Sequence, residues 1–510
     1  MSDDGVGDVA AYDRAVSGPG SGQNPLVVAI VGAGPSGIYA AAALIQHTEV
    51  PIEVIVLDRL PVPFGLVRYG VAPDHPSIRS VRHTLERTLD AAGIRFFGDV
   101  AIGADISAAE LRDSVDAVVY AFGAGSDRRL GIDGEDLPGS VAATEFVAWY
   151  CGHPDVHTDP ARSEVSTSRN SVPASFAPVT SLEPAPGRLE QEHFARLVAT
   201  TSDAVVVGVG NVALDVARIL TKGAGELADT DMAHDVLDSL AHKRVTDVHI
   251  LGRRGPAYTA FTTKELRELG QLPDLDLLVD PLDLELDESS QAVAARDKVA
   301  TRNLAVLREW THRPIGRASR RIHLHFWTRP VRVLGGDRVA GVEVERTGLD
   351  ADGAVTGRGA RRVIEAQLVV RAVGYRGEPL PGVPFDAGTG RIPHAEGRVI
   401  RDGGFAPAEY VTGWVKRGPT GVIGTNKSDA AETVTSLLHD VSTGALVPHG
   451  RAGRLETLLA DRGITPLDIG GWHRIDAAEV ELGRSRGRSR TTLARRSEML
   501  AAAEPDADHR

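Results

Sequence analysis

Two glycine-rich turns constrain the fold of this chain more than any other feature. One has the sequence GAGPSG at 32–37 and the other GVGNVA at 208–213, and each follows an apolar run. This is the pattern of a βαβ unit: the first glycine permits a tight turn, the second lets the backbone approach a pyrophosphate, and a small third residue lets helix and strand pack closely. The sequence therefore predicts an α/β fold with two Rossmann-like dinucleotide-binding domains.

The first turn is followed by a strand that ends in an acidic residue. The apolar run over 52–57 ends at Asp58, and a carboxylate about 20 residues beyond the last glycine is placed to accept hydrogen bonds from ribose hydroxyls. Because this carboxylate would repel a 2′-phosphate, the site is predicted to bind FAD or NAD; the alternative is a structural turn with an incidental aspartate. The residues predicted to contact this cofactor are Gly32, Gly34, Pro35, Ser36, Gly37, Asp58 and Arg59.

The second turn is followed by a strand that ends in two arginines. The apolar run over 248–251 leads into Arg253 and Arg254. Guanidinium groups bind phosphate through forked, charge-assisted hydrogen bonds, so this site is predicted to bind NADP and to prefer NADPH over NADH. The alternative is a pair of surface arginines without a ligand. The remaining predicted contacts are Gly208, Gly210, Asn211 and Val212.

Together the two sites indicate a reaction class. A protein with one flavin site and one NADP site is arranged to pass electrons from nicotinamide to flavin, a chemistry that the cofactors themselves supply.

Composition and charge exclude several other functions. With 56 Lys+Arg and 69 Asp+Glu the net charge is −13, which argues against a general nucleic-acid or anionic-membrane binder. The single cysteine, Cys151, excludes an intrachain disulfide, a C-x-x-C relay and a cluster held by four thiolates.

No metal site is predicted. No apolar stretch approaches the roughly 18 residues of a membrane span, and no signal peptide is recognisable, so a cytoplasmic protein is expected.

Two apolar runs, Ala121-Phe122-Gly123 and Ala372-Val373-Gly374, each end at a glycine. They are interpreted as the two crossings between an FAD domain and an NADP domain inserted into it. The predicted divisions are a disordered tail over 1–25, a first FAD-domain segment over 26–122, the NADP domain over 123–370 with a Ser/Pro-rich insertion over 157–187, a second FAD-domain segment over 371–475, and a disordered extension over 476–510.

Three further segments carry a family resemblance. PVPFGLVRYGVAPDHP at 61–76, FTTKELREL after the arginine pair and GWVKRGPTGVIGTNKSDAAETV from 413 closely resemble the adrenodoxin reductase type of ferredoxin–NADP reductase. The resemblance implies a glutathione reductase-like architecture and an FAD enzyme that moves electrons between NADPH and an iron–sulfur ferredoxin. The sequence departs from the family at Asp58, where a glutamate is common, at Phe122, and in the insertion.

The resemblance also assigns roles to individual residues. His75 is expected near the flavin ring and Glu265 on the nicotinamide side, and these two are the predicted catalytic residues. A loop histidine and a solvated helix glutamate are the alternatives. The further residues expected to contact the flavin are Gly65, Leu66, Val67, Gly123, Trp414, Gly421, Val422 and Ile423, with Gly421 and Glu265 also contacting NADP.

The predicted electron acceptor is an acidic ferredoxin. The stretch 296–332 has ten basic and two acidic residues, and docking is predicted near Arg302 and Arg308, although arginine clusters can also follow from composition. A monomer is expected. The alternatives are an NADPH-dependent flavin oxidoreductase with another acceptor, such as a glutamate synthase small-subunit-like protein or a diaphorase, and a non-catalytic NADP-sensing protein.

Overall fold

The structure is a computed structural model that describes residues 24–47, 49–158 and 191–505. The predicted N-terminal tail (1–25) and insertion (157–187) lie outside the described residues, apart from 24–25 and 157–158. No helix in these ranges is long and apolar enough to cross a membrane.

The first sheet contains the glycine turn at 32–37. Its seven strands lie in the order β16 (His394–Ala395), β17 (Arg398–Arg401), β18 (Gly404–Val411), β4 (Ala117–Tyr120), β1 (Leu26–Val31), β2 (Ile52–Leu57) and β3 (Ile94–Phe97). Strand β1 reads LVVAIV and is buried at every position, as expected of a central parallel strand covered on both faces.

Helices cover both faces of this sheet. One apolar face packs on α1 (Pro35–Ile45), α4 (Arg82–Leu89) and α15 (Thr425–Ser442), and the other on α5 (Ala108–Ser114) and α16 (Arg454–Asp461). The segment after β2 forms the single turns α2 (Leu66–Tyr69) and α3 (Pro76–Arg79). The four prolines of 61–76 predict an irregular loop, but Pro76 occupies the first position of a helical turn, where its missing N–H costs no hydrogen bond.

The second sheet contains the glycine turn at 208–213 and is entirely parallel. Its order is β6 (Ser140–Ala142), β14 (Leu368–Arg371), β7 (Asp203–Val207), β8 (Asp247–Leu251), β10 (Arg320–His325) and β9 (Leu275–Val279). An antiparallel sheet of β11 (Thr328–Gly335), β12 (Val339–Leu349) and β13 (Val355–Glu365) packs on one face of it.

The helices of this half cover the other face and the edges of the second sheet. They are α6 (Ala143–Tyr150), α7 (Gln191–Thr200), α8 (Asn211–Thr221), α9 (Ala224–Leu227), α10 (His234–Ala241), α11 (Thr263–Leu269), α12 (Glu288–Arg296) and α13 (Lys298–Trp310), with short 3-10 turns at Pro256–Tyr258 and Pro281–Leu284.

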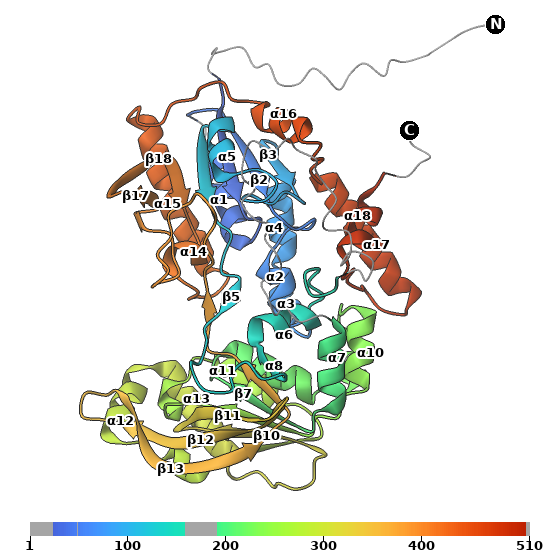
Figure 1. The fold of residues 1–510 in the computed structure, drawn as a ribbon, viewed down its shortest axis with the longest axis vertical. Coiled ribbons are helices and arrows are strands. Elements are labelled where there is room, and N and C mark those ends of the chain that lie inside the picture. The colour runs from blue at the N-terminus through green and yellow to red at the C-terminus, as the bar shows by residue number, and fades with distance from the viewer. Residues whose placement is uncertain (1–23, 48, 159–190, 506–510) are drawn as a thin grey trace, which may run out of the picture.

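The second half of the molecule interrupts the first in sequence. The chain leaves the first sheet after Tyr120 and leaves the second after Arg371, at the two predicted glycine crossings. The two connections pair as a short antiparallel ribbon, β5 (Ser126–Asp127) with β15 (Tyr375–Arg376), and β5 lies between the upper and lower halves in Figure 1. After β15 the chain returns to the first sheet, where β18 lies beside β4.

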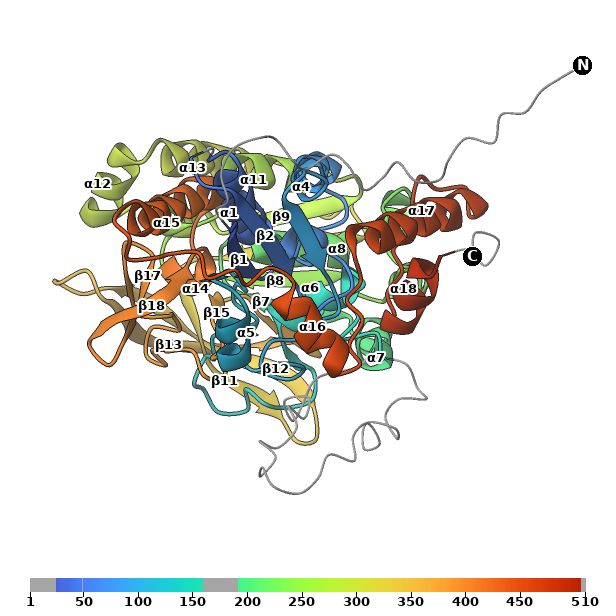
Figure 2. The same cartoon turned by 90° about the horizontal axis from the view of Figure 1, so that it is seen from above.

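The predicted disorder over 476–510 is wrong for the stretch that the structure describes. Helices α17 (Ile469–Ser485) and α18 (Arg496–Ala503) pack together at one side of the molecule (Figure 2). Glu479 is fully buried and accepts hydrogen bonds from Arg68 (3.1 Å) and Arg490 (3.0 Å). The arginine-rich composition predicts a solvated tail, whereas Arg490 is paired with a buried carboxylate and Arg496 with Asp99 of the FAD half.

Candidate functional site

The glycine turn at 32–37 packs tightly on its inner side and is open on its outer side. A Cβ atom on Gly37 would lie 2.0 Å from the carbonyl oxygen of Gly32, whereas a Cβ on Gly34 would meet nothing within 4 Å. Gly34 is the N-cap of α1 and supplies no side-chain cap, so the first N–H groups of this helix are available to a ligand. An open, uncapped helix N-terminus fits a pyrophosphate. Pro35 is half-buried and Ser36 is buried in the first turn of the helix.

Asp58 closes this first turn from the end of β2. Its Oδ2 accepts a hydrogen bond from the Ala33 N–H (2.8 Å) and its Oδ1 from the Leu60 N–H (2.9 Å). Burial raises the pKa of this carboxyl and outweighs both hydrogen bonds. Each carboxylate oxygen has a second lone pair, which is what a ribose hydroxyl would use. Arg59 is half-exposed and pairs with Asp155 at 2.7 Å.

The glycine turn at 208–213 repeats this construction. Gly208 has φ +136°, and a Cβ there would lie 2.2 Å from the Ala372 carbonyl oxygen, whereas a Cβ on Gly210 would meet nothing within 4 Å. Gly210 is an N-cap without a side-chain cap. Asn211 accepts a hydrogen bond from the Thr262 N–H at 2.8 Å, which fixes the loop before α11, and Val212 is half-buried.

The arginine pair lies at the open end of β8. Both side chains are exposed, and within the described ranges neither forms an ion pair. The Arg254 guanidinium lies over the Tyr258 ring, 5.4 Å from its centroid. The two charges therefore face solvent next to the uncapped helix of the second turn, where a 2′-phosphate would meet them.

Side-chain caps are present at some helix starts of the described chain and absent from most of them. Five other helices begin with a serine, threonine or aspartate whose side chain accepts a backbone N–H; these N-caps are Ser107, Thr262, Asp287, Asp297 and Asp468. Such caps satisfy N–H groups that would otherwise need a ligand or water. The helices of both glycine turns lack them, as do most other helices, so the support for cofactor binding at both turns is the open space beside Gly34 and Gly210 at the start of each helix.

The loops expected around the flavin lie against the first turn. Gly65 has φ +48°, and a Cβ there would lie 3.2 Å from the Gly34 Cα. Leu66 is half-buried and Val67 buried. Gly123 has φ +80° and open space at its Cβ position.

The second flavin loop crosses the start of α1. A Cβ on Gly413 would lie 2.3 Å from the Ser36 hydroxyl oxygen, and the half-buried Trp414 ring contacts Tyr375 at 5.2 Å between centroids. Gly421 and Val422 are exposed and Ile423 is half-buried. The Val422 N–H, expected to face the flavin, donates within the loop to Thr425 at 3.2 Å.

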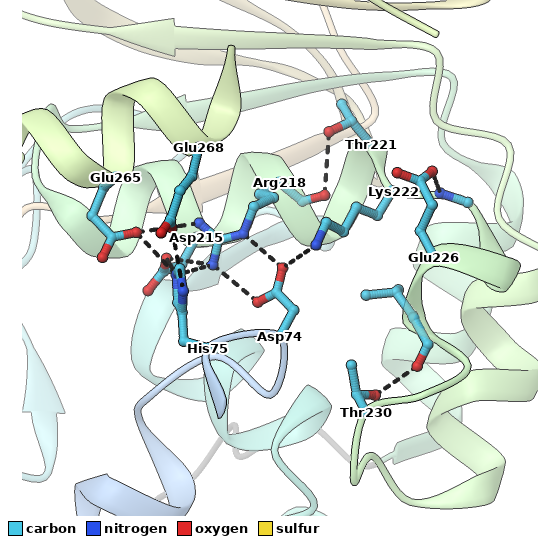
Figure 3. A network of polar contacts seen from close by, with 12 residues as sticks. Asp74, His75, Asp215, Arg218, Thr221, Lys222, Glu226, Thr230, Glu265 and Glu268 are labelled. Carbon is cyan, nitrogen blue, oxygen red and sulfur yellow. Dashed lines mark hydrogen bonds and ion pairs between the residues drawn. The ribbon is translucent and has the colours of Figure 1, made fainter. Parts of the chain in front are cut away.

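His75 and Glu265 come together although 190 positions separate them in the chain. Both side chains are 6% exposed, and His75 Nε2 lies 2.9 Å from Glu265 Oε2. The same nitrogen lies 3.2 Å from Asp215 Oδ1, and His75 Nδ1 lies 3.4 Å from Glu268 Oε2. Figure 3 shows His75 on the loop from the FAD half meeting side chains of α8 and α11 from the NADP half.

Arg218 and Lys222 extend this network. Arg218 Nε donates to Asp74 at 2.7 Å and its Nη2 to Asp215 at 2.8 Å, while Lys222 Nζ lies 2.8 Å from Asp74 (Figure 3). Arg218 also contacts His75 Nε2. Asp74, Asp215 and Arg218 are not among the residues predicted from the sequence. The available signals were an acidic residue next to His75 and an Asp–Arg pair three residues apart on the helix after the second glycine turn.

The carboxylates determine the charge of His75. Burial alone would lower the pKa of its imidazole, but the hydrogen bonds to Asp215 and Glu265 outweigh burial and raise the pKa to about 9. For Glu265, burial would raise the pKa of the carboxyl, and the His75 partner reverses this and lowers it. At neutral pH the pair is therefore an imidazolium with a carboxylate, and this ion pair joins the two halves.

His75, Glu265 and Glu268 could in principle hold a metal, since one ligand atom from each lies within 4.8 Å of the others. Arg218 already occupies this place, because its guanidinium contacts His75 and lies 3.5 Å from Glu265 Oε2. The cluster is therefore a set of ion pairs that includes its own cation.

Comparisons with known proteins agree with this geometry. A family model described as an NAD(P)-binding Rossmann-like domain matches residues 30–87. NADPH-ferredoxin reductase FprA of Mycobacterium tuberculosis is 42% identical over 492 residues, which cover 93% of this chain and 98% of that protein. The chain belongs to this reductase family. Mitochondrial NADPH:adrenodoxin oxidoreductase of Mus musculus is 38% identical, with 93% of this chain and 90% of that protein covered.

A solved structure extends the family likeness to the whole fold. The structure entitled "Mycobacterium tuberculosis FprA in complex with NADPH" has a TM-score of 0.82 and 40% identity, and covers 94% of this chain and 99% of that chain. Membership of the family confirms the resemblance stated from the sequence, the predicted fold class and the enzyme class. The predicted cofactors, FAD and NADP(H), are those of this family.

Proposed function

We propose that this protein transfers electrons from NADPH through FAD to a ferredoxin-type iron–sulfur protein. The observation that carries the proposal is the His75–Glu265 pair, which joins the halves of the molecule that hold the two open glycine turns. The names of the relatives, an NADPH-ferredoxin reductase and an NADPH:adrenodoxin oxidoreductase, support the same activity.

Each set of residues has a separate task in this proposal. FAD, when bound, accepts two electrons together from NADPH and releases them one at a time. The uncapped N–H groups of α1 and α8 would bind the two pyrophosphates, and Asp58 would bind the flavin nucleotide's ribose. Arg253 and Arg254 would bind the 2′-phosphate of NADPH.

His75 and Glu265 would position the nicotinamide and hold a proton beside the flavin. Their partners Asp215 and Arg218 fix both side chains in place. In this arrangement, His75→Gln or Glu265→Gln slows reduction of the bound flavin by NADPH in rapid mixing. Unchanged rates in both variants would remove the pair from the mechanism.

The iron–sulfur partner is proposed to dock on α13. Arg302 and Arg308 are exposed on this helix, within a stretch whose ten basic residues outnumber two acidic ones. Five other arginines of this stretch are ion-paired with acidic residues, so the charges of Arg302 and Arg308 are the ones that would attract an acidic partner, even though the whole chain carries −13. The protein is proposed to act as a cytoplasmic monomer.

The activity is tested by ferredoxin-dependent reduction of cytochrome c, with NADPH and NADH compared. Turnover that requires ferredoxin and prefers NADPH supports the proposal. NADPH oxidation with a neutral quinone but none with any ferredoxin would instead indicate a flavin oxidoreductase with another acceptor. A protein that binds NADPH but takes up no flavin would indicate a nucleotide-sensing role.

The docking face is tested separately, by charge reversal and by salt. We expect Arg302→Glu with Arg308→Glu to raise the KM for ferredoxin without changing quinone reduction, and added salt to weaken ferredoxin turnover of the wild type. The matched control is Arg338→Glu, an exposed arginine in the turn between β11 and β12. Equal losses in the control would move the docking site away from α13.

A further inference from the structure

Three histidines gather on one face of the second sheet, away from the His75 network. His249 lies on β8 and His323 and His325 on β10, and the parallel register places His323 directly beside His249. All three side chains are half-buried, on the sheet face that β11–β13 cover. Their rings stack nearly parallel, with centroids 4.3, 5.3 and 6.0 Å apart.

The ring nitrogens are close enough to share one ion. One nitrogen from each histidine lies within 4.8 Å of the other two, and His249 Nδ1 is 3.0 Å from His325 Nε2. Zinc–imidazole bonds of about 2.0–2.1 Å in a tetrahedral site separate neighbouring nitrogens by roughly 3.3 Å. His249 and His325 are therefore already near ligand spacing, and a ring nitrogen of His323 lies within 4.8 Å of both.

The donor atoms of the cluster indicate the class of metal. Imidazoles bind an ion through a ring-nitrogen lone pair, and they suit zinc, copper and nickel rather than magnesium.

Charged groups around the cluster are arranged like the outer shell of a metal site. Asp247 Oδ1 accepts from His323 Nε2 at 2.9 Å, which keeps the proton on that nitrogen and leaves Nδ1 with its lone pair. A carboxylate behind a ligand histidine is the usual outer partner of zinc sites. Asp247 is itself held by Arg321 Nε at 2.6 Å.

One neighbour opposes metal binding. The Arg362 Nη2 group lies 3.1 Å from His325 Nδ1 and donates to it, so the ring proton of His325 stays on Nε2, the nitrogen that faces His249. For Nε2 to bind a metal, the proton must be on Nδ1 and Arg362 must move aside. Arg362 is exposed on β13, so its side chain has room to do so.

We propose that His249, His323 and His325 form a binding site for a divalent transition-metal ion of the zinc class. The site is separate from the proposed electron path, since it uses the opposite face of the second sheet from α8. The histidines H-x-H at 323–325 are visible in the sequence, but His249 is far away in the chain, so the sequence predicts no metal site there. A bound ion would join β8 to β10 and stabilise the second sheet.

The proposal is tested by zinc titration of the full-length, flavin-loaded protein after chelator treatment. We expect the wild type to bind one more zinc ion per chain than His323→Gln/His325→Gln, in calorimetry and in equilibrium dialysis. Zinc should raise the melting temperature of the wild type and not that of the variant. Magnesium should do neither. The matched control is His242→Gln/His312→Gln, two exposed histidines of the same half.

Equal zinc stoichiometry and equal thermal shifts in the wild type and the double variant would overturn the proposal. A second variant keeps the test decisive if the double variant folds poorly. Arg362→Gln leaves all three histidines in place and frees His325 Nδ1 to carry the ring proton, so it should bind zinc several-fold more tightly than the wild type. Its control is Arg361→Gln, whose side chain pairs with Glu343. Unchanged zinc affinity in Arg362→Gln would also count against the site.

Discussion

The two nucleotide-binding turns are alike where they would meet phosphate and different where they would meet ribose. In each, one glycine packs against backbone, the next faces open space, and the following helix starts without a side-chain cap. At the end of the next strand, however, the first turn has Asp58 and the second has Arg253 and Arg254. The shared construction supports any dinucleotide, so the choice of cofactor depends on the strand ends.

The strand ends also differ in how they are held. Asp58 accepts two backbone hydrogen bonds and belongs to the turn itself, whereas both arginines are exposed and Arg254 contacts the Tyr258 ring without an ion pair to any described residue. The first turn is therefore built before its ligand arrives. The second acquires its full set of contacts only when a phosphate is bound.

The residue at the third glycine position of the first turn, Gly37, is expected to have the largest effect on stability and on flavin binding. Gly37→Ala places a methyl group 2.0 Å from the Gly32 carbonyl oxygen, and because backbone must move, we expect a loss of about 3 kcal/mol or more and loss of bound flavin. Flavin absorbance of the purified protein and urea unfolding measure both effects. The second turn already has Ala213 at this position, so Ala213→Gly should change NADPH binding little; equal damage from both substitutions would contradict the comparison.

Replacing Arg253 and Arg254 is expected to have the next largest effect, on the KM for NADPH. Hydrogen bonds to charged groups contribute about 1.5–3 kcal/mol each, so Arg253→Gln/Arg254→Gln should raise the KM for NADPH roughly a hundredfold with little change in kcat. The KM for NADH should hardly change, which abolishes the preference between the two. Steady-state kinetics with both nucleotides, with Arg338→Gln as control, measure this. A preserved NADPH preference would assign selectivity to other residues.

His75 joins the two halves, and its effect depends on pH. Because its folded pKa of about 9 lies above the ordinary 6.5, its contribution to stability is complete below about pH 6.5 and is lost as the pH rises through about 9. We expect His75→Gln to lower the free energy of unfolding by on the order of 2 kcal/mol at pH 6, and by less at pH 10. Urea unfolding at several pH values measures this, with the exposed His83→Gln as control. A difference that grows with pH would mean that His75 is neutral in the folded protein.

The smallest effect is expected from replacing Asp58, the acidic residue at the end of β2, and it concerns FAD binding. Asp58→Asn keeps one carbonyl acceptor but removes the charge and replaces the other acceptor with a donor facing a backbone N–H. We expect about 1 kcal/mol weaker FAD binding, roughly fivefold, with NADPH binding unchanged. Equilibrium dialysis of FAD against the stripped protein measures it. A loss comparable to that of Gly37→Ala would mean that the two backbone hydrogen bonds of Asp58 contribute more to FAD binding than its contact with ribose.

The sequence predicts the features of this molecule that depend on local spacing. Both glycine turns and the strand-end residues follow from patterns within about 30 residues. The family resemblance indicates His75 and Glu265 as separate site residues, but their direct contact could not be predicted because 190 positions of chain separate them.

Other features could not be predicted because distant residues determine them. Asp215 and Arg218 resemble an ordinary helix surface until Asp74 and His75 are placed against them. The C-terminal arginines were misread for the same reason, since Arg490 is paired with Glu479 and Glu479 with Arg68, 411 positions away.

The short ribbon of β5 and β15 has a consequence for how the chain is synthesised. The first sheet cannot be completed until β18 emerges from the ribosome, and by then the whole intervening half has been made. Closing a loop of that length costs chain entropy, and the cost falls when the intervening segment is already folded with its two ends side by side. We expect the NADP half to become compact first during translation and to bring the unfinished flavin half together.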